Sequence, residues 1–376
     1  MNTIKQLIEK YCPDGVEYKK LGEVAEIGTG SQDRKDAVHD GLYPFYVRSK
    51  DILRINKYLF DEEAIIIPGE GGIGDIFHYV KGKYGLHQRA YRVHLEVDSL
   101  STKFLYYYFR SRFKKFIFNK AVSATVTSIR KPMLEKFEVP VPPLFVQHEI
   151  VRILDSFTSL EAELEAELEA RRKQYEYYRD QLLSFKHLSG GGKNKVEWKT
   201  LPQISQNLDS KRKPIKSSRR VAGIYPYYGA SGIVDYVEDY IFDGDFLLVS
   251  EDGANLLART SKIAFSISGK NWVNNHAHVL SFHDAVRRKF VEFYIENLDL
   301  SRYISAGAQP KLTKDKLNSI PIPQPPYEKQ QEIVSILDRF ESLVNDISTG
   351  LPAEIAARHQ QYEYYRDQLL SFKRKS

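Results

Sequence analysis

The sequence predicts an α+β protein made of two similar halves, each with a mixed β-sheet domain and a long helix. Thirteen residues, Gln174 to Lys186, recur at 361–373, an offset of 187 positions. Both copies place apolar residues at coiled-coil spacing, whereas the segments before them show strand-like patterns. Such a chain is expected to fold with an internal pseudo-two-fold axis, as a homodimer would, and to present two similar surfaces.

The repeat extends upstream in a less perfect form. Residues 149–160 reappear at 332–343 with an offset of 183, and residues 43–46 reappear at 225–228 with an offset of 182. Between these anchors the two halves diverge. One type of segment has therefore been kept, while the other has been free to vary.

Composition excludes several classes of protein. The chain has 376 residues, 42% hydrophobic and 28% charged, which suffices for two domains with their own cores. A single cysteine, Cys12, excludes an internal disulfide framework and a multi-cysteine zinc site. No apolar run approaches the roughly 18 residues of a membrane span, and the N-terminal sequence leads into no signal-type core. We expect a cytoplasmic protein.

Positive charge is concentrated in the two variable segments. Residues 1–147 hold 23 basic and 18 acidic side chains, and residues 196–327 hold 17 and 14. The repeated segments are slightly acidic, with 6 basic and 9 acidic side chains in 148–186 and 7 and 8 in 328–376. Since a surface that binds phosphate needs cations, the variable segments are the better candidates for nucleic-acid contact.

The first repeated segment is expected to be one long helix that follows the prolines at 140, 142 and 143. From about 147 to 186 it would run for roughly 60 Å at about 1.5 Å per residue. An apolar stripe of this length needs a partner helix, and the second copy is the nearest one. The predicted packing residues of this helix are Ile150, Leu154, Phe157, Leu164, Leu168, Tyr175 and Tyr178.

The second repeated segment has the same stripe with an interruption. The pattern breaks at Thr349-Gly350-Leu351-Pro352 and resumes at Ile355. Glycine and proline explain a break there, and the rise in offset from 183 to 187 corresponds to about one helical turn. Its predicted packing residues are Ile333, Leu337, Phe340, Val344, Tyr362 and Tyr365.

A shorter repeat lies inside the first helix. Glu161-Ala162-Glu163-Leu164 is followed by Glu165-Ala166-Glu167-Leu168. Alanine, glutamate and leucine are strong helix formers, so each copy lengthens a helix by about 6 Å and rotates it by roughly 40°. The tetrad is either an ordinary solvated acidic face or a spacer that sets a length, and we favour the spacer.

The variable segments contain strands and one helix each. In the first, strands are expected at 64–67, 76–80 and 91–95 and a helix at 103–118; the second repeats this order at 246–249, 262–267, 277–281 and 287–297. Each segment closes in a proline-rich turn, at 139–143 and 320–323. The domains are thus expected at 1–146 and 196–327, the spacer helices at 147–187 and 328–376, and a glycine-rich linker at 188–195.

Three motifs resemble catalytic or ligand-binding sites, but their sequence context does not support such roles. Residues 69–74 match a dinucleotide fingerprint, yet a strand-like run follows where a helix is required, so a glycine-rich hairpin turn is favoured. Residues 324–327 resemble the catalytic motif of amino-methyltransferases, but glutamine stands first and no cofactor loop precedes it. His276 and His278 share a strand face without a third metal ligand. We therefore expect no catalytic residues, no metal and no cofactor.

The layout of variable segment, proline-rich turn, Gln-x-x-Ile helix start and Tyr-Glu-Tyr-Tyr-Arg-Asp-Gln-Leu-Leu-Ser-Phe, all present twice, resembles the specificity subunit of type I restriction-modification systems. The Gln-x-x-Ile starts are at Gln147 and Gln330. The resemblance implies two target-recognition domains that each read half of a split DNA site. It also implies an antiparallel coiled coil that separates them and docks methyltransferase subunits, expected to be two. Methylation and cleavage would belong to the modification and restriction subunits of the complex.

Candidate DNA contacts follow from charge and from polar insertions between strands. Residues 307–312 also resemble a family loop that lies near DNA, and 124–129 align with that loop. Phosphate contacts are expected from the basic stretches and base reading from polar loop residues. The candidates are Arg34, Lys35, Arg48, Lys50, Gln88, Arg89, Thr125, Thr127, Lys211, Arg212, Lys213, Arg219, Arg220, Asn274, Asn275, Gln309 and Lys311.

Two alternatives stay open from the residues alone. One is a structural adaptor whose long helices organise protein partners and whose variable domains bind non-nucleic ligands. The other is a self-sufficient DNA methyltransferase or nuclease, which would have to act as an isolated chain.

Overall fold

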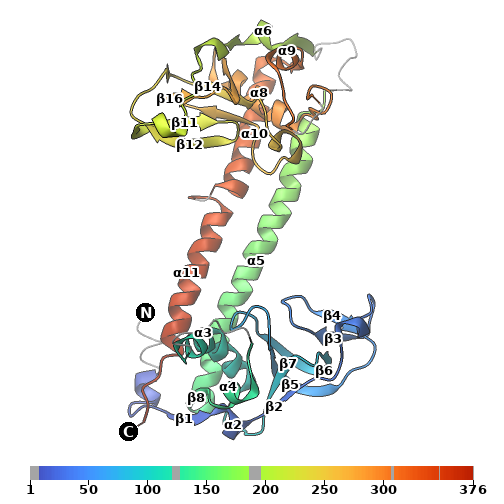
Figure 1. The fold of residues 1–376 in the computed structure, drawn as a ribbon, viewed down its shortest axis with the longest axis vertical. Coiled ribbons are helices and arrows are strands. Elements are labelled where there is room, and N and C mark those ends of the chain that lie inside the picture. Colours follow the sequence, from blue (N-terminus) through green and yellow to red (C-terminus); the bar gives the residue numbers. More distant parts are fainter. Residues whose placement is uncertain (1–7, 121–127, 186–195, 306–308, 347, 376) are drawn as a thin grey trace. The chain divides into compact units, whose positions relative to one another are not determined.

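The computed structural model describes residues 8–120, 128–185, 196–305, 309–346 and 348–375. The chain divides into two compact units, shown in Figure 1 with colours that follow the sequence. The first unit comprises Met1–Glu165 with Glu354–Ser376, and the second comprises Ala166–Ala353. Each unit contains a variable segment together with parts of the long helices.

The first unit is built on a six-stranded sheet in which the neighbours β3 and β6 are parallel and the other neighbouring pairs are antiparallel. The central strand β5 carries four consecutive fully buried residues, Ala64 to Ile67, as expected for a strand covered on both faces. The strand order is β2 (Ala25–Thr29), β7 (Ala90–Leu95), β5 (Phe60–Pro68), β6 (His78–Leu86), β3 (Tyr43–Tyr46) and β4 (Leu53–Ile55).

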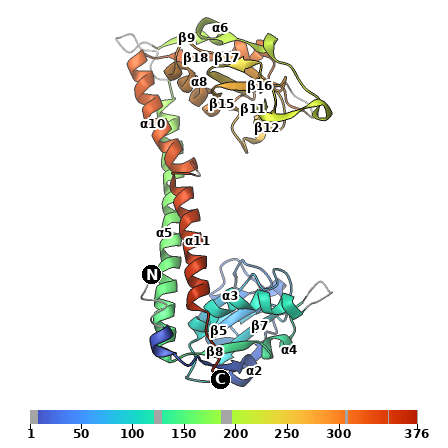
Figure 2. The ribbon, with the colours of Figure 1, turned by 90° about the vertical axis from the view of Figure 1, so that its left-hand side faces the viewer.

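An aromatic helix packs against this sheet. In α3 (Thr102–Lys120) the residues Phe104, Phe109 and Phe113 are fully buried and share one core with Ile65 of β5. Figure 2 shows α3 beside β5 and β7. Short helices complete the unit: α2 (Leu21–Val24), the 3₁₀ turn η1 (Arg34–Asp36) and α4 (Lys131–Glu135).

The second unit repeats this architecture with a divided sheet. β13 and β14 together take the place of β5, and β15 and β16 together take the place of the single strand β6. As β3 does with β6, β11 runs parallel to β16. The two four-stranded sheets are β10 (Gln206–Asn207), β17 (Ala277–Ser281), β14 (Phe246–Ser250) and β15 (Ala264–Ile267); and β12 (Gly232–Val237), β11 (Ala222–Gly229), β16 (Lys270–Val273) and β13 (Phe242–Asp243).

The core of the second unit forms between this sheet and α8 (Ala285–Asn297). Phe290 and Ile295 of α8 are fully buried with Leu247 of β14, and Asp284 caps the helix by accepting a hydrogen bond from the Arg287 N–H at 2.9 Å. The remaining elements of the unit are α6 (Leu201–Ile204), η2 (Asp209–Lys211), η3 (Ser217–Arg219), α7 (Asn255–Ala258) and α9 (Lys314–Asn318).

The proline-rich segments differ from the expected turns, because each begins as a strand. β8 (Glu138–Val141) pairs with β1 (Glu17–Lys20), and β18 (Pro321–Gln324) pairs with β9 (Glu197–Thr200). Proline is tolerated in these two-stranded ribbons because its missing N–H can face away from the single partner strand. The chain turns only afterwards, at Pro142–Pro143 in the first unit.

The repeated segments form three helices: α5 (Leu144–Leu182), α10 (Tyr327–Asn345) and α11 (Leu351–Leu369). The predicted break between the last two is confirmed. A Cβ on Gly350 would lie 2.5 Å from the Ser342 carbonyl oxygen, so a larger residue would push the two helix ends apart. None of the helices in the described ranges is both long and apolar enough to cross a membrane.

The Gln-x-x-Ile motif has a structural explanation. The amide of Gln147 is fully buried; it donates to the carbonyls of Pro142 at 2.7 Å and Ser99 at 2.9 Å, and accepts from the Ser101 N–H at 2.8 Å. At the corresponding place, Gln330 donates to the Pro325 carbonyl at 2.9 Å. Each glutamine thus ties the start of a long helix to the proline segment before it.

Candidate nucleic-acid interface

Three loops of the first unit meet where the central strand β5 ends. The Gly69 N–H donates to the Arg89 carbonyl at 2.9 Å, and the His87 N–H donates to the Tyr46 carbonyl at 2.9 Å. Arg48, Glu70 and His87 line a pocket of about 250 Å³ between these loops. The end of β5, the β6–β7 turn and the loop after β3 therefore form one surface.

Two arginines on this surface share one carboxylate. Glu70 accepts a hydrogen bond from Arg48 Nη1 at 2.8 Å and from Arg89 Nη1 at 3.1 Å. These bonds, from Arg48 and then from Arg89, hold the pKa of the Glu70 carboxyl below its ordinary value. All three side chains are partly exposed, so the group faces solvent while its geometry is fixed.

The β6–β7 turn is held by its first side chain. His87 is buried, and its Nδ1 accepts from the Arg89 N–H at 3.0 Å. Burial lowers the pKa of His87, which favours the neutral ring that this acceptor role requires. Gln88 is exposed and donates from Nε2 to Asp33 at 3.1 Å, which links the turn to the residue that precedes η1.

The other candidates of the first unit are distributed around this surface. Arg34 lines the same pocket, whereas Lys35 and Lys50 are exposed. Thr125 and Thr127 lie outside the described residues. The Ile129 N–H donates to the Gly69 carbonyl at 2.8 Å, so residue 129 is bound to the same loop.

The second unit repeats this backbone framework with different side chains. The Glu251 N–H donates to the His276 carbonyl at 2.8 Å, the Asn274 N–H donates to the Tyr228 carbonyl at 3.1 Å, and the Leu312 N–H donates to the Glu251 carbonyl at 2.7 Å. These three bonds correspond one by one to those of Gly69, His87 and Ile129. The two halves thus share a scaffold on which the exposed residues differ.

The side chains on this second framework only partly match those of the first unit. Asp252, which corresponds to Glu70, pairs with His276 at 2.9 Å, as Glu70 pairs with Arg89. Asn274 is buried and its Oδ1 accepts from the His276 N–H at 2.8 Å, the role that His87 has in the first unit. Asn275 is exposed. Asn274 therefore shapes the turn, and its neighbours are the side chains that face outward.

The basic loop of the second unit divides into internal and exposed cations. Arg212 is 13% exposed and donates to Glu251 at 2.7 Å and to the Ala277 carbonyl at 2.7 Å. Arg220 pairs with Asp235 at 3.2 Å and stacks over the Tyr227 ring. Both arginines have structural partners. The exposed candidates are Lys211, Lys213, Arg219, Gln309 and Lys311.

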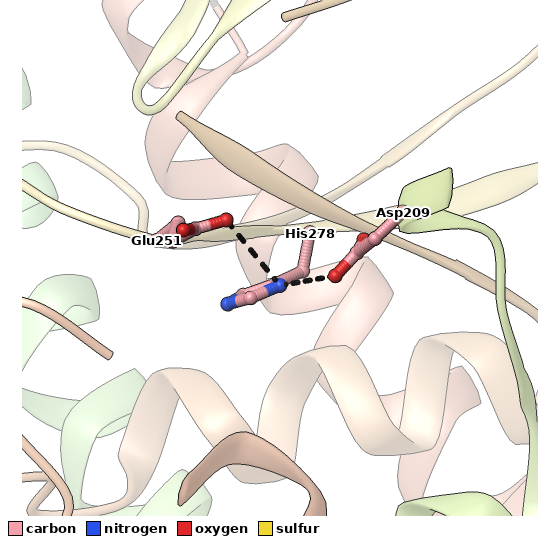
Figure 3. Close-up of side chains that lie close together, drawn as sticks. All are labelled: Asp209, Glu251 and His278. Carbon is pink, nitrogen blue, oxygen red and sulfur yellow. Dashed lines mark hydrogen bonds and ion pairs between the residues drawn. The ribbon is translucent and has the colours of Figure 1, made fainter. Parts of the chain in front are cut away.

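Three potential metal ligands form a cluster beside this loop. Ligand atoms of Asp209, Glu251 and His278 lie within 4.8 Å of one another. Figure 3 shows the three side chains close together. However, His278 contacts Asp209 through Nδ1 at 2.6 Å and the Leu312 carbonyl through Nε2 at 2.8 Å. Because the Leu312 carbonyl can only accept, Nε2 carries a proton and is not available to a metal, and Nδ1 is occupied by its contact with Asp209.

Cations of the chain also compensate the acids of this cluster. Glu251 contacts Arg212 at 2.7 Å and Lys311 at 3.1 Å. Burial by itself would raise the pKa of Glu251, but its hydrogen bond with Arg212 and its other cationic neighbours lower it. The residues therefore fit an internal ion network that fixes Lys311 at the loop edge, and they do not fit a metal centre.

The predicted helix-packing residues make contacts between helices within each unit. In the first, Phe157 of α5 stacks on Tyr365 of α11 at 5.5 Å between ring centroids, and Glu161 contacts His359 at 3.3 Å. Positions thus rise along α5 as they fall along α11, which makes the pair antiparallel. Ile150, Leu154 and Tyr362 are buried in the same core, and Leu164 is half-buried.

In the second unit the same helix packs against α10. Tyr175 and Tyr178 approach Phe340 with ring centroids at 6.4 and 5.7 Å. Tyr178 is nevertheless 41% exposed, because it lies at the edge of this contact. Of the remaining predicted residues, Ile333, Leu337 and Val344 are buried, and Leu168 is half-buried.

Sequence reasoning missed the acidic members of the surface. Glu70 and Asp252 follow the central strands at an offset of 182, whereas Arg89 and His276 differ by 187. The offset rises because the connection between β5 and β6 spans 69–77, whereas the corresponding connection between β14 and β15 is longer and spans 251–263. Comparing both offsets could have paired each acid with its cation.

Comparisons with known proteins by sequence and by fold give the same kind of match. A family model described as "Type I restriction modification DNA specificity domain" matches residues 13–170 and 194–357. A putative type I restriction enzyme specificity subunit of Haemophilus influenzae is 42% identical over 182 residues, 47% of each chain. A type I restriction enzyme specificity subunit of Escherichia coli is 38% identical over 262 residues, 63% of each chain. The chain thus spans about half to two thirds of the length of these relatives.

The fold is similar to that of a solved protein over most of the chain. The crystal structure of a type I restriction-modification S subunit from M. genitalium matches with a TM-score of 0.65 and 18% identity, covering 95% of this chain and 96% of that one. The predicted α+β class with two recognition domains and long helices is confirmed, and the adaptor alternative gains no support. The chain belongs to the family of type I restriction-modification DNA specificity proteins.

Proposed function

We propose that this chain is the DNA specificity subunit of a type I restriction-modification complex and reads an asymmetric site in two separated halves. The observation that supports this most directly is the shared loop framework that carries Glu70 and Arg89 in one unit and Asp252 and His276 in the other. Equal scaffolds with unequal outward side chains suit two recognition domains with different half-sites.

In this proposal the recognition domains are residues 1–146 and 196–327, joined by a linker at 188–195. The spacer helices are 147–187 and 328–376, and their pairing sets the gap between the half-sites. The tetrad repeat lies within α5, where its glutamates and alanines are largely exposed while Leu164 and Leu168 are half-buried. A length change there would preserve the packing stripe, as a spacer requires.

Two methyltransferase subunits would dock on the repeated helices. Tyr177 and Tyr364 occupy the same place in the two identical copies, and both are exposed, at 61% and 54%. One turn further along, Gln181 and Gln368 are exposed on the same helix face, and Ser184 and Ser371 are exposed just beyond the helix ends. Since packing does not require identity at exposed positions, a common partner explains it.

The partners supply the chemistry that the proposal leaves out of this chain. Methyl transfer to adenine belongs to the modification subunits, and cleavage belongs to restriction subunits that join through the complex. No cofactor is assigned to the specificity subunit itself. Because its proposed target is chromosomal DNA, we expect the protein in the cytoplasm.

The decisive experiment assembles the chain with its modification subunits and maps methylated adenines in genomic DNA. The expected result is one bipartite, asymmetric motif with a fixed nonspecific gap, and binding that weakens steeply with salt. A single contiguous motif would contradict the proposal. Methylation by the isolated chain would instead support a self-sufficient enzyme.

A further inference from the structure

The Arg48–Glu70–Arg89 group of the first unit has a geometry suited to reading a base. Within the described ranges each guanidinium makes its side-chain hydrogen bonds through Nη1 alone. The Nε and Nη2 N–H groups on the other edge of each fork remain for another acceptor. Guanine presents two acceptors in the major groove, O6 and N7, which match two parallel N–H donors.

The shared carboxylate argues against a role in holding phosphates. Glu70 offsets one of the two positive charges and lies within 3.1 Å of both arginines. An acid at this place repels the DNA backbone, whereas near a base edge it could accept only from a donor such as cytosine N4. The group is therefore better matched to the edge of a G·C base pair than to the backbone.

The backbone around the group is fixed, which reduces the entropy lost when DNA binds. A Cβ on Gly69 would lie 2.8 Å from the Arg89 carbonyl oxygen, so glycine allows the strand end and the turn to approach. The Arg89 N–H is itself held by His87 Nδ1 at 3.0 Å. Arg89 is thus positioned through its backbone on both sides and through its side chain by Glu70.

The second unit lacks this arrangement at the equivalent positions. Ala230 corresponds to Arg48, and His276 corresponds to Arg89. The His276–Asp252 pair at 2.9 Å keeps the acid–cation relationship but removes both forks. Any preference that depends on bidentate arginine should therefore be confined to one half-site.

We propose that Arg48 and Arg89, with Glu70 as their positioning residue, determine specificity for a G·C base pair in the half-site read by the first unit. This rests on the proposed function, since it names the base that one recognition domain selects. Arginine is needed because lysine supplies charge without the planar pair of donors.

The test uses the complete complex with its modification subunits and a library of duplexes randomised in both half-sites. Arg48→Lys and Arg89→Lys keep the charge, and at least one of them is expected to relax one G·C position in one half-site. Discrimination at that position should fall roughly 10- to 100-fold, the range of one bidentate contact. The other half-site should keep its preference, which shows that folding and assembly are intact.

Lys35→Ala and Lys50→Ala are matched controls, because both lysines are exposed in the same unit. They should lower methylation of all sequences alike and leave the motif unchanged. Glu70→Gln should weaken base discrimination while it strengthens binding to nonspecific DNA, since it releases both arginines from their acid. A merely structural role for Glu70 would not raise nonspecific binding.

Two results would overturn the inference. One is a wild-type motif in which the half-site altered by these variants has no G·C pair. The other is an unchanged motif in both arginine variants, with or without a uniform loss of activity. In either case a bipartite wild-type motif would leave the proposed function standing, whereas its absence would remove the proposed function as well.

Discussion

The side chain of Gln147 donates to the Pro142 carbonyl at 2.7 Å and so joins the first turn of α5 to the proline segment before it. The contact is buried, and Gln330 repeats it with Pro325 in the second unit. Both polar groups of the Gln147 amide are satisfied inside the protein. The long helix is therefore anchored to its domain by hydrogen bonds as well as by apolar packing.

Replacing Gln147 with leucine should destabilise the first unit. The change leaves the Ser101 N–H and the Pro142 carbonyl without their partner, and each buried unsatisfied group costs about 1–3 kcal/mol. We expect a loss of about 3 kcal/mol in the free energy of unfolding, measured by urea denaturation of the full chain. Glu149→Gln, a half-buried neighbour on the same helix, is the control and should change stability little. Equal stability of Gln147→Leu and wild type would show that the contact contributes nothing.

The helix pair of the first unit should depend on the ring of Phe157. Phe157→Ala removes the stack on Tyr365, and the cost should be about 2–4 kcal/mol for a half-buried aromatic side chain. Thermal unfolding followed by circular dichroism measures it. Tyr177→Ala removes an exposed ring from the same helix and should leave the midpoint unchanged. Equal losses of stability in the two variants would show that the pairing of Phe157 with Tyr365 does not set the effect.

Deleting Glu165 to Leu168 should shorten the gap between the half-sites and leave their sequences unchanged. Four residues correspond to about 6 Å of helix and roughly 40° of rotation. The motif methylated by the assembled complex reports both the gap length and the sequences of the half-sites. Glu165→Ala keeps the length and should give the wild-type gap. A deletion variant with an unaltered gap would contradict the role of α5 as a spacer.

Stability of the second unit should fall in acid through Asp209. Burial by itself raises the pKa of this carboxyl, but the His278 and Arg212 contacts lower it below its ordinary value. The stabilisation is therefore complete above about pH 4 and is lost as the pH falls through the lowered pKa. Urea midpoints between pH 2 and 6 should show this, and Asp209→Asn should flatten the curve. An unchanged acid limb in the variant would assign the effect to other groups.

Two neighbouring cations of the basic loop should behave differently. Lys213 is exposed, so Lys213→Ala should weaken DNA binding equally for all sequences and reduce the log–log salt slope by about 1. Arg212 is internal, so Arg212→Ala should lower stability, because Glu251 loses its 2.7 Å partner. Binding titrations at several salt concentrations and urea denaturation separate the two. A salt slope that changes only in Arg212→Ala would reverse the assignment.

Repetition made the helices and the order of strands predictable. Coiled-coil spacing located Phe157 and Tyr365, and the glycine and proline at 350 and 352 located the break between α10 and α11. Local rules were less successful where the partner is distant in sequence. Pro140 looks like a turn residue, but it pairs with Tyr18 in a two-stranded ribbon that only the tertiary fold provides.

The candidate surface was predicted in outline but not in its electrostatics. Positive charge and polar insertions pointed to Arg89 and Arg212 alike, because sequence gives charge without its partner. The structure leaves Arg89 half exposed on Glu70 and buries Arg212 on Glu251. That difference depends on side chains that meet although they are 19 and 39 positions apart in the sequence.

The correspondence of Gly69 with Glu251 has an evolutionary consequence. The two residues make the same main-chain bonds, to Arg89 in one half and to His276 in the other, although one has no side chain and the other has a charged one. A framework maintained by main-chain atoms tolerates exchange of the residues it displays. New target preferences could therefore arise by substitution at a few displayed positions, or by recombination of whole halves, without the need to invent a new fold.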